Sequence, residues 1–443
     1  MLNQPIVILG LGETGLSCAR FLFRSKIPFS VVDSRENPPQ LSHFKAEFPD
    51  IPVYTGGFPK AVLGECRTLL LSPGIAKDNP LLLQSISKNC EIIGDIELLA
   101  RLTTLAIVGI TGSNGKSTVT RLVGEMVKQA GLKVGIGGNL GPPALDLLEA
   151  NPEILVLELS SFQLETTYSL KPFVSTILNI SADHLDRHKT LDNYVNAKLR
   201  IYNQAKHIVF NREETSLVSR LPPGIPSISF GLSTPQNGEY GIIHAKGESW
   251  LAKGNMALLK STDLKLLGQH NLMNALSALA IGETLNLSKE VMIETLKSFQ
   301  GLPHRCEWVR TLREVVWVND SKGTNVGATL AALWGLGRSI AGKWILIAGG
   351  IGKNADFSPL IEPLSQYCRS VILLGEAKKE LHDTFKAHIP CVFVNSMEEA
   401  VLEANILAHP EDGVLLSPAC SSLDMFRNFE ERGEVFKACV QHL

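Results

Sequence analysis

The chain has 443 residues, 44% of them hydrophobic and 19% charged; this length exceeds what one hydrophobic core serves, so we expect two to four domains. A formal charge of −2 and the absence of a Lys/Arg block argue against a broad surface for nucleic acid or an anionic membrane. Eight scattered cysteines without a C-x-x-C motif, no basic leader and no apolar run of roughly 18 residues predict a soluble, cytoplasmic protein without a disulfide framework or a membrane span.

The first predicted unit contains a strand over residues 5–9, a turn with the spacing G-x-G-x-x-G over residues 10–15, and a helix-like stretch ending at Phe23. A second strand over residues 29–32 is followed by Asp33. A glycine turn between strand and helix, with an acid after the next strand, is the βαβ fingerprint of a nucleotide site. The alternative is a glycine turn that serves only helix–strand packing. The common register of strand, helix and acid favours a bound nucleotide.

Residues 69–71 predict another strand, which leads into the loop Ser72-Pro73-Gly74. Open α/β sheets bind ligands outside the carboxyl ends of their strands. We therefore expect this loop to face the first glycine loop.

The segment 105–120, LAIVGITGSNGKSTVT, predicts a buried strand over residues 105–110, a glycine-bearing turn and a helix that Lys116 opens. Backbone N–H groups, a helix N-terminus and one lysine then surround a volume that suits a polyphosphate and its Mg²⁺. The spacing departs from G-x-x-x-x-G-K-[ST], because Ile110 stands where the first glycine is expected. The alternative, a chance Gly-Lys-Ser in a soluble turn, does not account for the flanking strand and helix. The predicted contacts to a nucleoside triphosphate are Gly112, Ser113, Asn114, Gly115, Lys116, Ser117 and Thr118.

Polar clusters follow two further predicted strands, at residues 154–159 and 174–178. Because Mg²⁺ prefers oxygen ligands, usually one or two carboxylates with phosphate and water, Glu158 is the candidate metal ligand, helped by Ser117. The alternative for Glu158 is an acid that caps the next turn. His184 is equally well explained as a surface histidine.

Residues 222–254 are rich in Pro and Gly and predict turns and short antiparallel strands, and a helix-like stretch follows over residues 271–285. Asn271 and Asn274 share one face of that helix, where amides suit the donor and acceptor edge of adenine. Capping of the helix by Asn271 is an equally good explanation.

The third predicted unit begins near residue 303 and alternates strands with helix-like segments, which predicts a parallel sheet covered by helices. Its expected strands are residues 315–318, 344–348, 371–374, 392–394 and 414–416. Arg305 suits a phosphate clamp, Asp320 a ribose, and Lys322 the compensation of developing charge. For any one of them alone, a surface ion pair is a reasonable alternative. The loops at 349–353 and 421–424 are two more places suited to an anion.

Together these motifs resemble the bacterial Mur ligases over essentially the whole chain. The motifs that carry the resemblance are GLGETG (10–15), DSR (33–35), SPG (72–74), TGSNGKST (111–118), GGNLG (137–141), ELSSFQL (158–164), DHLDRH (183–188), NAKLRIY (196–202), HNLMNA (270–275), LPHRCE (302–307), NDSKGTN (319–325) and LLSPACSSLDMF (415–426). Within the family, DSR (33–35), SPG (72–74), LPHRCE (302–307) and LLSPACSSLDMF (415–426) are typical of the member that adds D-glutamate.

The resemblance implies an α/β fold of three domains. Residues 1–94 would form a Rossmann-like UDP-binding domain, residues 95–302 a central P-loop ATPase-like domain with a mixed sheet, and residues 303–443 a C-terminal Rossmann-like domain that receives the amino acid.

The resemblance also implies roles for particular residues. The UDP-substrate would be held by Thr14, Asp33, Ser34, Arg35, Gly74 and Asn139. ATP and phosphoryl transfer would be served by Lys116, Ser117, Asn271, Asn274, Arg305, Asp320 and Lys322. D-Glutamate would be received by Thr324, Lys353, Ser422, Leu423 and Phe429. The Mg²⁺ cluster would consist of Ser117, Glu158, His184 and Lys198.

The implied activity is the ATP-dependent, carbon–nitrogen bond-forming addition of D-glutamate to UDP-N-acetylmuramoyl-L-alanine through an acyl phosphate and a tetrahedral intermediate. His184 would position the amino acid or accept a proton. The resemblance also implies that Lys198 is carbamylated, and electrostatics supports this, because a carbamate attracts Mg²⁺ whereas an ammonium repels it. We further expect domain closure on binding and a monomer without nucleic-acid or membrane partners. One departure is Ile351, at a position where the family usually has an acid, and a smaller one is Ser34, often threonine.

Three other functions fit the sequence less well. A folylpolyglutamate synthetase shares the phosphate loop but lacks a separate first domain such as residues 1–94. An NAD-dependent dehydrogenase leaves the Lys116 loop unexplained, and a GTPase-type switch needs an N-K-x-D motif, which the sequence lacks.

Overall fold

The computed structural model describes residues 2–245, 247–265, 268–353 and 355–443. Its contacts divide the chain into two compact units. Unit 1 comprises Met1–Gly231, Gly238–Tyr240 and Ser277–Thr295, and unit 2 comprises Leu232–Asn237, Gly241–Leu276 and Leu296–Leu443. Within the described ranges, no helix is both long enough and apolar enough to cross a bilayer.

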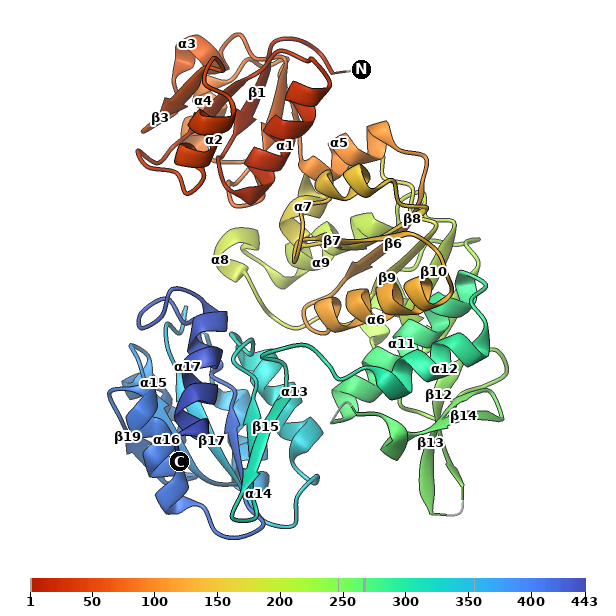
Figure 1. Ribbon diagram of the computed structural model, residues 1–443, viewed down its shortest axis with the longest axis vertical. Helices are drawn as coiled ribbons and strands as arrows, with labels where there is room; N and C mark the ends of the chain where they lie inside the picture. Colours follow the sequence, from red (N-terminus) through yellow and green to blue (C-terminus); the bar gives the residue numbers. More distant parts are fainter. Residues whose placement is uncertain (1, 246, 266–267, 354) are drawn as a thin grey trace. The chain divides into compact units, whose positions relative to one another are not determined.

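Unit 1 begins with a five-stranded parallel sheet in the order β3-β2-β1-β4-β5 (Figure 1). Its strands are β1 (Ile6–Leu9), β2 (Ser30–Asp33), β3 (Val53–Thr55), β4 (Thr68–Leu71) and β5 (Glu91–Ile93). Its helices are α1 (Glu13–Arg24), α2 (Leu41–Glu47), α3 (Lys60–Leu63) and α4 (Pro80–Ser85). Alternate residues of β1 face opposite ways, so that Ile6 and Ile8 join the core with α1 and α2 while Val7 and Leu9 join the core with α3 and α4. The sheet is therefore covered on both faces.

The strand order reverses at β1, whose neighbours are β2 and β4, and this is the point where open α/β sheets form a ligand crevice. The glycine loop after β1 is tightly built there. Gly10 has φ +101°, and a Cβ on Gly15 would lie 1.9 Å from the carbonyl oxygen of Gly10. Only glycine allows this approach of the helix to the strand.

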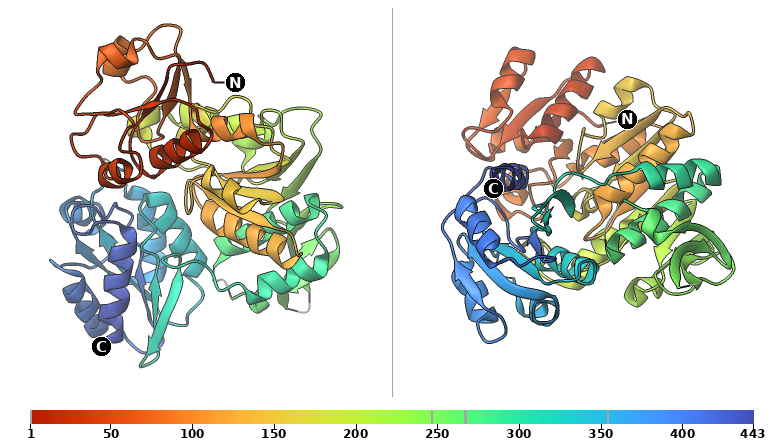
Figure 2. Two further views of the ribbon diagram at one scale, coloured as in Figure 1. Left: turned by 45° about the horizontal axis from the view of Figure 1, so that its top comes forward. Right: turned by 60° about the horizontal axis from the view of Figure 1, so that its bottom comes forward.

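Unit 1 also contains six parallel strands in the order β11-β10-β9-β6-β8-β7. They are β6 (Ala106–Thr111), β7 (Val134–Gly138), β8 (Ile154–Glu158), β9 (Val174–Ile177), β10 (His207–Asn211) and β11 (Ser227–Phe230). The helices in this part of the chain are α5 (Asp95–Leu102), α6 (Lys116–Gln129), α7 (Ser161–Glu165), α8 (Leu185–His188), α9 (Leu191–Leu199) and α10 (Thr215–Val218). Figure 2 shows α6 beside the strands β6, β7 and β8 that it contacts.

The segment that follows contains β12 (Tyr240–Ala245), β13 (Glu248–Lys253) and β14 (Met256–Lys260). The predicted antiparallel pairing is confirmed for β13 with β14, whereas β11 pairs in parallel with β10 and, through Phe230 and Tyr240, with β12. The chain continues through α11 (Gln269–Thr284) and α12 (Lys289–Ser298). Short 3₁₀ helices are η1 (Asp146–Ala150), η2 (Arg200–Tyr202), η3 (Ser261–Asp263) and η4 (Ser358–Leu360).

Most of unit 2 is a six-stranded sheet in the order β15-β16-β20-β17-β18-β19. Its strands are β15 (Glu307–Leu312), β16 (Val315–Asn319), β17 (Trp344–Gly349), β18 (Cys368–Leu374), β19 (Cys391–Phe393) and β20 (Gly413–Leu416). Its helices are α13 (Val326–Leu336), α14 (Ile361–Tyr367), α15 (Lys378–Phe385), α16 (Met397–Leu407) and α17 (Phe429–Gln441). The first three helices cover one face of the sheet, and α16 and α17, which lie side by side in Figure 1, cover the other.

Five strands of this sheet are parallel, as predicted, but β15 is antiparallel to β16. A two-residue connection joins β15 to β16, and so short a connection permits only a hairpin. The sequence pattern did not predict β15.

Candidate active site

The first glycine loop borders a pocket of about 440 Å³ at the carboxyl ends of β1, β2 and β4. All six residues predicted to hold the UDP-substrate line it, together with Gly10, Ser72 and Gln163. The hydroxyl of Ser72 donates a 2.8 Å hydrogen bond to the carbonyl of Gly10, which confirms that the 72–74 loop faces the first glycine loop.

The carboxylate of Asp33 is hydrogen-bonded to other residues of this pocket and its rim. Oδ2 accepts from the backbone N–H of Leu11 at 2.7 Å, and the guanidinium of Arg35 binds both carboxylate oxygens at 2.9 and 2.7 Å. Burial raises the pKa of Asp33, but the hydrogen bonds from Arg35 and the backbone outweigh burial and hold that pKa below its ordinary value. Arg35 is half exposed, so Asp33 positions a cation at the rim of the pocket.

The phosphate loop joins β6 to α6, as predicted, and Lys116 is the first residue of the helix. Gly115, with φ +82°, supplies the left-handed turn before it. The ammonium of Lys116 donates to the carbonyls of Gly112 and Ser113 at 2.9 and 2.7 Å, so the lysine folds back over its own loop. A cation and a helix N-terminus at one point favour a polyanion.

A second lysine lies at the same loop. Lys198 of α9 is buried, and its ammonium donates to the carbonyl of Gly112 at 2.8 Å and lies 3.3 Å from Thr111 Oγ1. Burial, reinforced by the nearby charge of Lys116, places the pKa of Lys198 well below its ordinary value. The loop therefore has two amines, one of which is readily deprotonated.

Glu158, the last residue of β8, connects this loop with the first pocket. Its Oε1 accepts a 2.8 Å hydrogen bond from the amide of Asn139, which lines that pocket. Glu158 is buried, and its charge acts on Lys198. Capping of the next turn, the alternative explanation for Glu158, is wrong, because Ser160 caps α7.

Of the other predicted metal ligands, Ser117 is buried in the first turn of α6. The side chain of His184 is 41% exposed; its ring packs against Phe162 with 4.9 Å between ring centroids, and its Nε2 lies 3.7 Å from Asp183. Across the described residues, no three His, Cys, Asp or Glu side chains form a metal-binding group.

Unit 2 brings together several residues that were predicted for ATP. Asn271 is the third residue of α11, and its side-chain oxygen accepts a 3.0 Å hydrogen bond from Asn274. Asp320 accepts from Ser417 Oγ at 2.7 Å, and burial raises its pKa to about 6 although the nearby Arg305 acts against the rise. Arg305 also lies close enough to His270 to help burial lower the pKa of that histidine to about 4.

Four of the residues predicted for charge compensation or D-glutamate lie on two loops, one after β16 and one after β20. The ammonium of Lys322 lies 5.2 Å from the ring centre of Phe429, the first residue of α17. The backbone carbonyl of Ser422 accepts from Phe426, which folds the loop after β20, and Leu423 at its tip is 65% exposed. Thr324 lies in the β16 loop, just before the Asn325 cap of α13.

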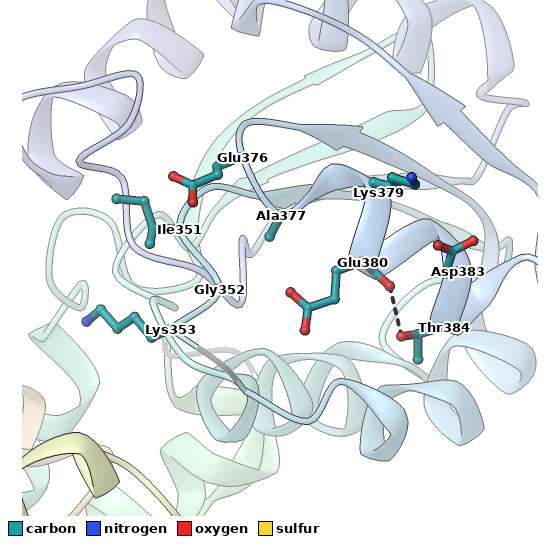
Figure 3. Close-up of a pocket in the computed structure, with 9 residues that line it drawn as sticks. All are labelled: Ile351, Gly352, Lys353, Glu376, Ala377, Lys379, Glu380, Asp383 and Thr384. Atoms are coloured by element: carbon teal, nitrogen blue, oxygen red, sulfur yellow. Dashed lines mark hydrogen bonds between the residues drawn. The ribbon is translucent and has the colours of Figure 1, made fainter.

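Lys353 lies on a third loop, after β17. It lines a pocket of about 780 Å³ that also contains the acids Glu376, Glu380 and Asp383 (Figure 3). Figure 3 shows the Lys353 side chain directed away from Glu380. Ile351, the departure noted in the sequence, exchanges backbone hydrogen bonds with Ser421 at 2.9 and 3.0 Å, so the backbone fixes this loop without an acid at position 351.

Family models match the chain in three successive segments. The N-terminal model, described as Mur ligase MurD-like, matches residues 4–94; the Mur ligase middle domain matches residues 110–282; and the Mur ligase glutamate ligase domain matches residues 304–420. The chain is 48% identical to the UDP-N-acetylmuramoylalanine–D-glutamate ligase of Nitrosococcus oceani, with 100% of this chain and 99% of that protein covered. The chain belongs to the Mur ligase family.

Other Mur ligases agree with this placement. Proteins of the same name are 48% identical in Legionella pneumophila strain Paris, with 100% of both chains covered, and 47% identical in Pseudomonas aeruginosa, with 99% and 98% covered. Among solved structures, a pseudomurein peptide ligase from Methanothermus fervidus has a TM-score of 0.63 at 21% identity, with 99% of both chains covered. The UDP-N-acetylmuramate–alanine ligase of Thermotoga maritima has a TM-score of 0.63 at 19% identity and the same coverage. These structures share the fold, and the predicted α/β class with three Mur ligase domains is confirmed.

Two residues that were not predicted from the sequence shape the phosphate loop of this Mur ligase. Asn179, just beyond β9, accepts from the backbone N–H groups of Ser113 and Asn114 through its backbone and side-chain oxygens. The hydroxyl of Tyr194 lies 3.0 Å from that of Ser113, and its ring faces the ammonium of Lys198 at 4.6 Å. The sequence could have indicated both residues, because Asn179 follows a neighbouring strand and Tyr194 precedes Lys198 by one helical turn.

A third missed residue is Arg432, which is buried in α17 and joins three loops of unit 2. Its guanidinium donates to the backbone carbonyl and hydroxyl of Ser321, to the carbonyl of Cys420, and to that of Gly349 at 3.4 Å. Burial lowers its pKa to about 10. Nothing in the surrounding sequence, EERGEVF, distinguishes this arginine from a surface residue.

Proposed function

We propose that this Mur ligase is an ATP-dependent enzyme that joins D-glutamate to UDP-N-acetylmuramoyl-L-alanine in the synthesis of peptidoglycan precursors. Full-length relatives at 46–48% identity bear the name of that activity. The observation that carries the proposal is the Asn139–Glu158 hydrogen bond, because Asn139 lines a nucleotide-type pocket and Glu158 pairs with Ile110, just before the phosphate loop, in the same unit. A nucleotide-anchored acid bound in the first pocket would thereby be directed toward the ATP loop.

The chemistry needs activation before bond formation. The L-alanine carboxylate of the substrate resists nucleophilic attack because it is already anionic, and phosphorylation by ATP converts it into an acyl phosphate. Lys116 moves from its carbonyl partners to the transferring phosphoryl group and offsets its negative charge. The neutral amine of D-glutamate then attacks the acyl carbon, and phosphate leaves from the tetrahedral intermediate.

Glu158, Ser117 and Lys198 fit a Mg²⁺ site only if Lys198 is modified. A bound Mg²⁺ would neutralise triphosphate charge, and an ammonium at position 198 would repel it. The buried, low-pKa amine of Lys198 supports carbamylation, because CO₂ reacts with the neutral amine. The carbamate would give the site a second carboxylate-like ligand beside Glu158. Incubation with ¹³C-bicarbonate should give one carbamate resonance that the Lys198→Met variant lacks.

D-Glutamate carries two carboxylates and therefore needs cations. The pocket beside Lys353 contains Glu376, Glu380 and Asp383, which repel such a ligand. We therefore assign the amino acid to the other side of the Lys353 loop, where the bridge between Ile351 and Ser421 leads to Ser422. Lys322 beside Phe429 supplies a further positive charge in the same unit.

The test is phosphate release from ATP with Mg²⁺ and UDP-N-acetylmuramoyl-L-alanine, with one amino acid added at a time. We expect release with D-glutamate and none with L-glutamate, D-aspartate or L-alanine, and a product heavier by one glutamyl residue. Equal release with L-alanine, or release with a pteridine substrate instead of the UDP-substrate, would contradict the proposal.

A further inference from the structure

Two cysteines of the first sheet face each other. Cys66 lies just before β4 and Cys90 just before β5, and these strands pair in parallel from Thr68 and Glu91 onward. The two Sγ atoms are 3.5 Å apart, although the residues are 24 positions apart in the sequence. A disulfide needs about 2.05 Å between its sulfurs, so an approach of about 1.5 Å would join them.

The two thiols differ in the properties that control oxidation. Cys90 is partly exposed, whereas Cys66 is fully buried and its sulfur also lies 3.1 Å from the carbonyl of Thr68. The hydrogen bond between the two thiols lowers the pKa of Cys90, although burial acts against this shift. The same pairing, together with burial, raises the pKa of Cys66. Cys90 is therefore the thiol that a peroxide or a small disulfide reaches first. It is also the thiol that more readily forms the attacking thiolate.

We propose that Cys66 and Cys90 are a reversible oxidation site, in which Cys90 is the attacking thiol and Cys66 the resolving thiol. With hydrogen peroxide, the Cys90 thiolate takes up one oxygen and hydroxide leaves, which gives a sulfenic acid. The sulfur of Cys66 then displaces that oxygen as water, and the proton of Cys66 leaves with it. The two thiols together lose two electrons and two protons, and one peroxide becomes two waters. A small dithiol reverses the reaction.

The resulting bond would close the segment between the two residues, which contains β4, the 72–74 loop and α4. This loop includes Ser72 and Gly74 of the first pocket. Closing a loop of this length restricts the unfolded chain, so the oxidised protein should melt higher, by on the order of 5 °C.

Cys391 supplies a matched control. It is partly exposed like Cys90, but burial raises its pKa, and its sulfur lies 3.5 Å from the carbonyl of Ile389. Substitution of Cys391 should not affect the oxidation at Cys90.

The experiment treats the reduced full-length protein with hydrogen peroxide, or in a second arm with oxidised glutathione, and counts thiols after denaturation. We expect eight thiols before treatment and six after it, with one cross-linked peptide pair containing positions 66 and 90. Cys391→Ser should lose the same two thiols. Cys66→Ser should accumulate one glutathione adduct at Cys90, and Cys90→Ser should leave Cys66 reduced.

The wild-type peptide map is decisive without any variant. A map that lacks the 66–90 pair after peroxide treatment overturns the proposal, as does a Cys90→Ser protein in which Cys66 is oxidised at the wild-type rate. Return of both thiols with dithiothreitol supports reversibility, and their failure to return contradicts it.

Discussion

The two glycine loops of unit 1 have the same strand–turn–helix plan but prepare different kinds of site. At the first loop, Asp33 is locked to Leu11 and Arg35, so that one cation stands at the rim of a pocket walled by backbone. At the second, Lys116 and Lys198 both donate to the carbonyl of Gly112, so that two amines crowd one turn. The first loop offers a shaped pocket with one peripheral charge, and the second offers the charged amine of Lys116 beside the buried amine of Lys198, whose pKa is lowered. The glycine spacing alone does not reveal this difference.

The largest effect should follow removal of the charge at the second loop. Lys116→Ala should lower kcat for ADP release by about 10³-fold or more, since it removes the cation that offsets the negative charge of the transferring phosphoryl group. Affinity for the UDP-substrate should stay nearly unchanged, because the first pocket does not include Lys116. Kinetics and a separate equilibrium binding titration measure the two quantities. Lys128→Ala, an exposed position on the same helix, is the control. Joint loss of UDP-substrate binding would end the distinction between the loops.

The second amine should matter next. Lys198→Met should lower kcat by about 10²-fold, because it removes a group of the proposed Mg²⁺ site. The variant should remain folded, because methionine fills a buried site without a charge to desolvate. Lys206→Met, an exposed lysine in the same unit, should keep full activity. An active Lys198→Met protein would show that this lysine has only a packing role.

Two glycines of the first loop should differ in how much their replacement by alanine destabilises the protein. Gly15→Ala should destabilise the protein by about 2 kcal/mol, because its Cβ would collide with the carbonyl oxygen of Gly10. Gly12→Ala is the matched variant, since a Cβ there meets no atom within 4 Å. Denaturant titration compares the two, and equal stabilities would show that the loop opens more readily than its geometry indicates.

At the rim of the first pocket, Arg35→Ala should raise KM for the UDP-substrate about tenfold, the cost of one charge-assisted contact. kcat should change little. Arg20→Ala removes an exposed ion pair with Glu47 between helices α1 and α2, which cover the same sheet, and should leave KM unaltered. A fall in kcat at constant KM would place Arg35 at the reaction rather than at the nucleotide.

The smallest effect concerns pH. The folded-state pKa of Lys198 is lowered, so from that pKa up to the unfolded value of about 10.4 the unfolded chain binds more protons and the wild type gains stability as pH rises. The variant Lys198→Met lacks this gain. At pH 7 the variant should melt above wild type, because it has no charge to bury. This difference in Tm should shrink by roughly 1–2 °C between pH 7 and pH 9.5 in CO₂-free buffer. A constant difference would contradict a depressed pKa.

Much of the fold was predictable, because strands such as β6 and β17 are continuous apolar runs that end in glycine or polar residues. The resemblance to the Mur ligases supplied the six residues predicted to hold the UDP-substrate, and the structure gathers all of them in the first pocket. Their role in binding the substrate stays a prediction, as do the domain boundaries at residues 94 and 302. The antiparallel β15 escaped prediction, since its residues Glu307–Leu312 have no continuous apolar run.

The sequence by itself determined the local pieces: which segments are strands, where glycine must turn the chain, and which residue types follow each strand. These depend on interactions between near neighbours, and a motif records them directly. Only the tertiary structure decided that Lys198 is buried beside Lys116, that Arg432 joins three loops, and that Cys66 meets Cys90. Burial and charge proximity are contributed by segments far apart in the chain, and they act through a dielectric environment that exists only once those segments have packed.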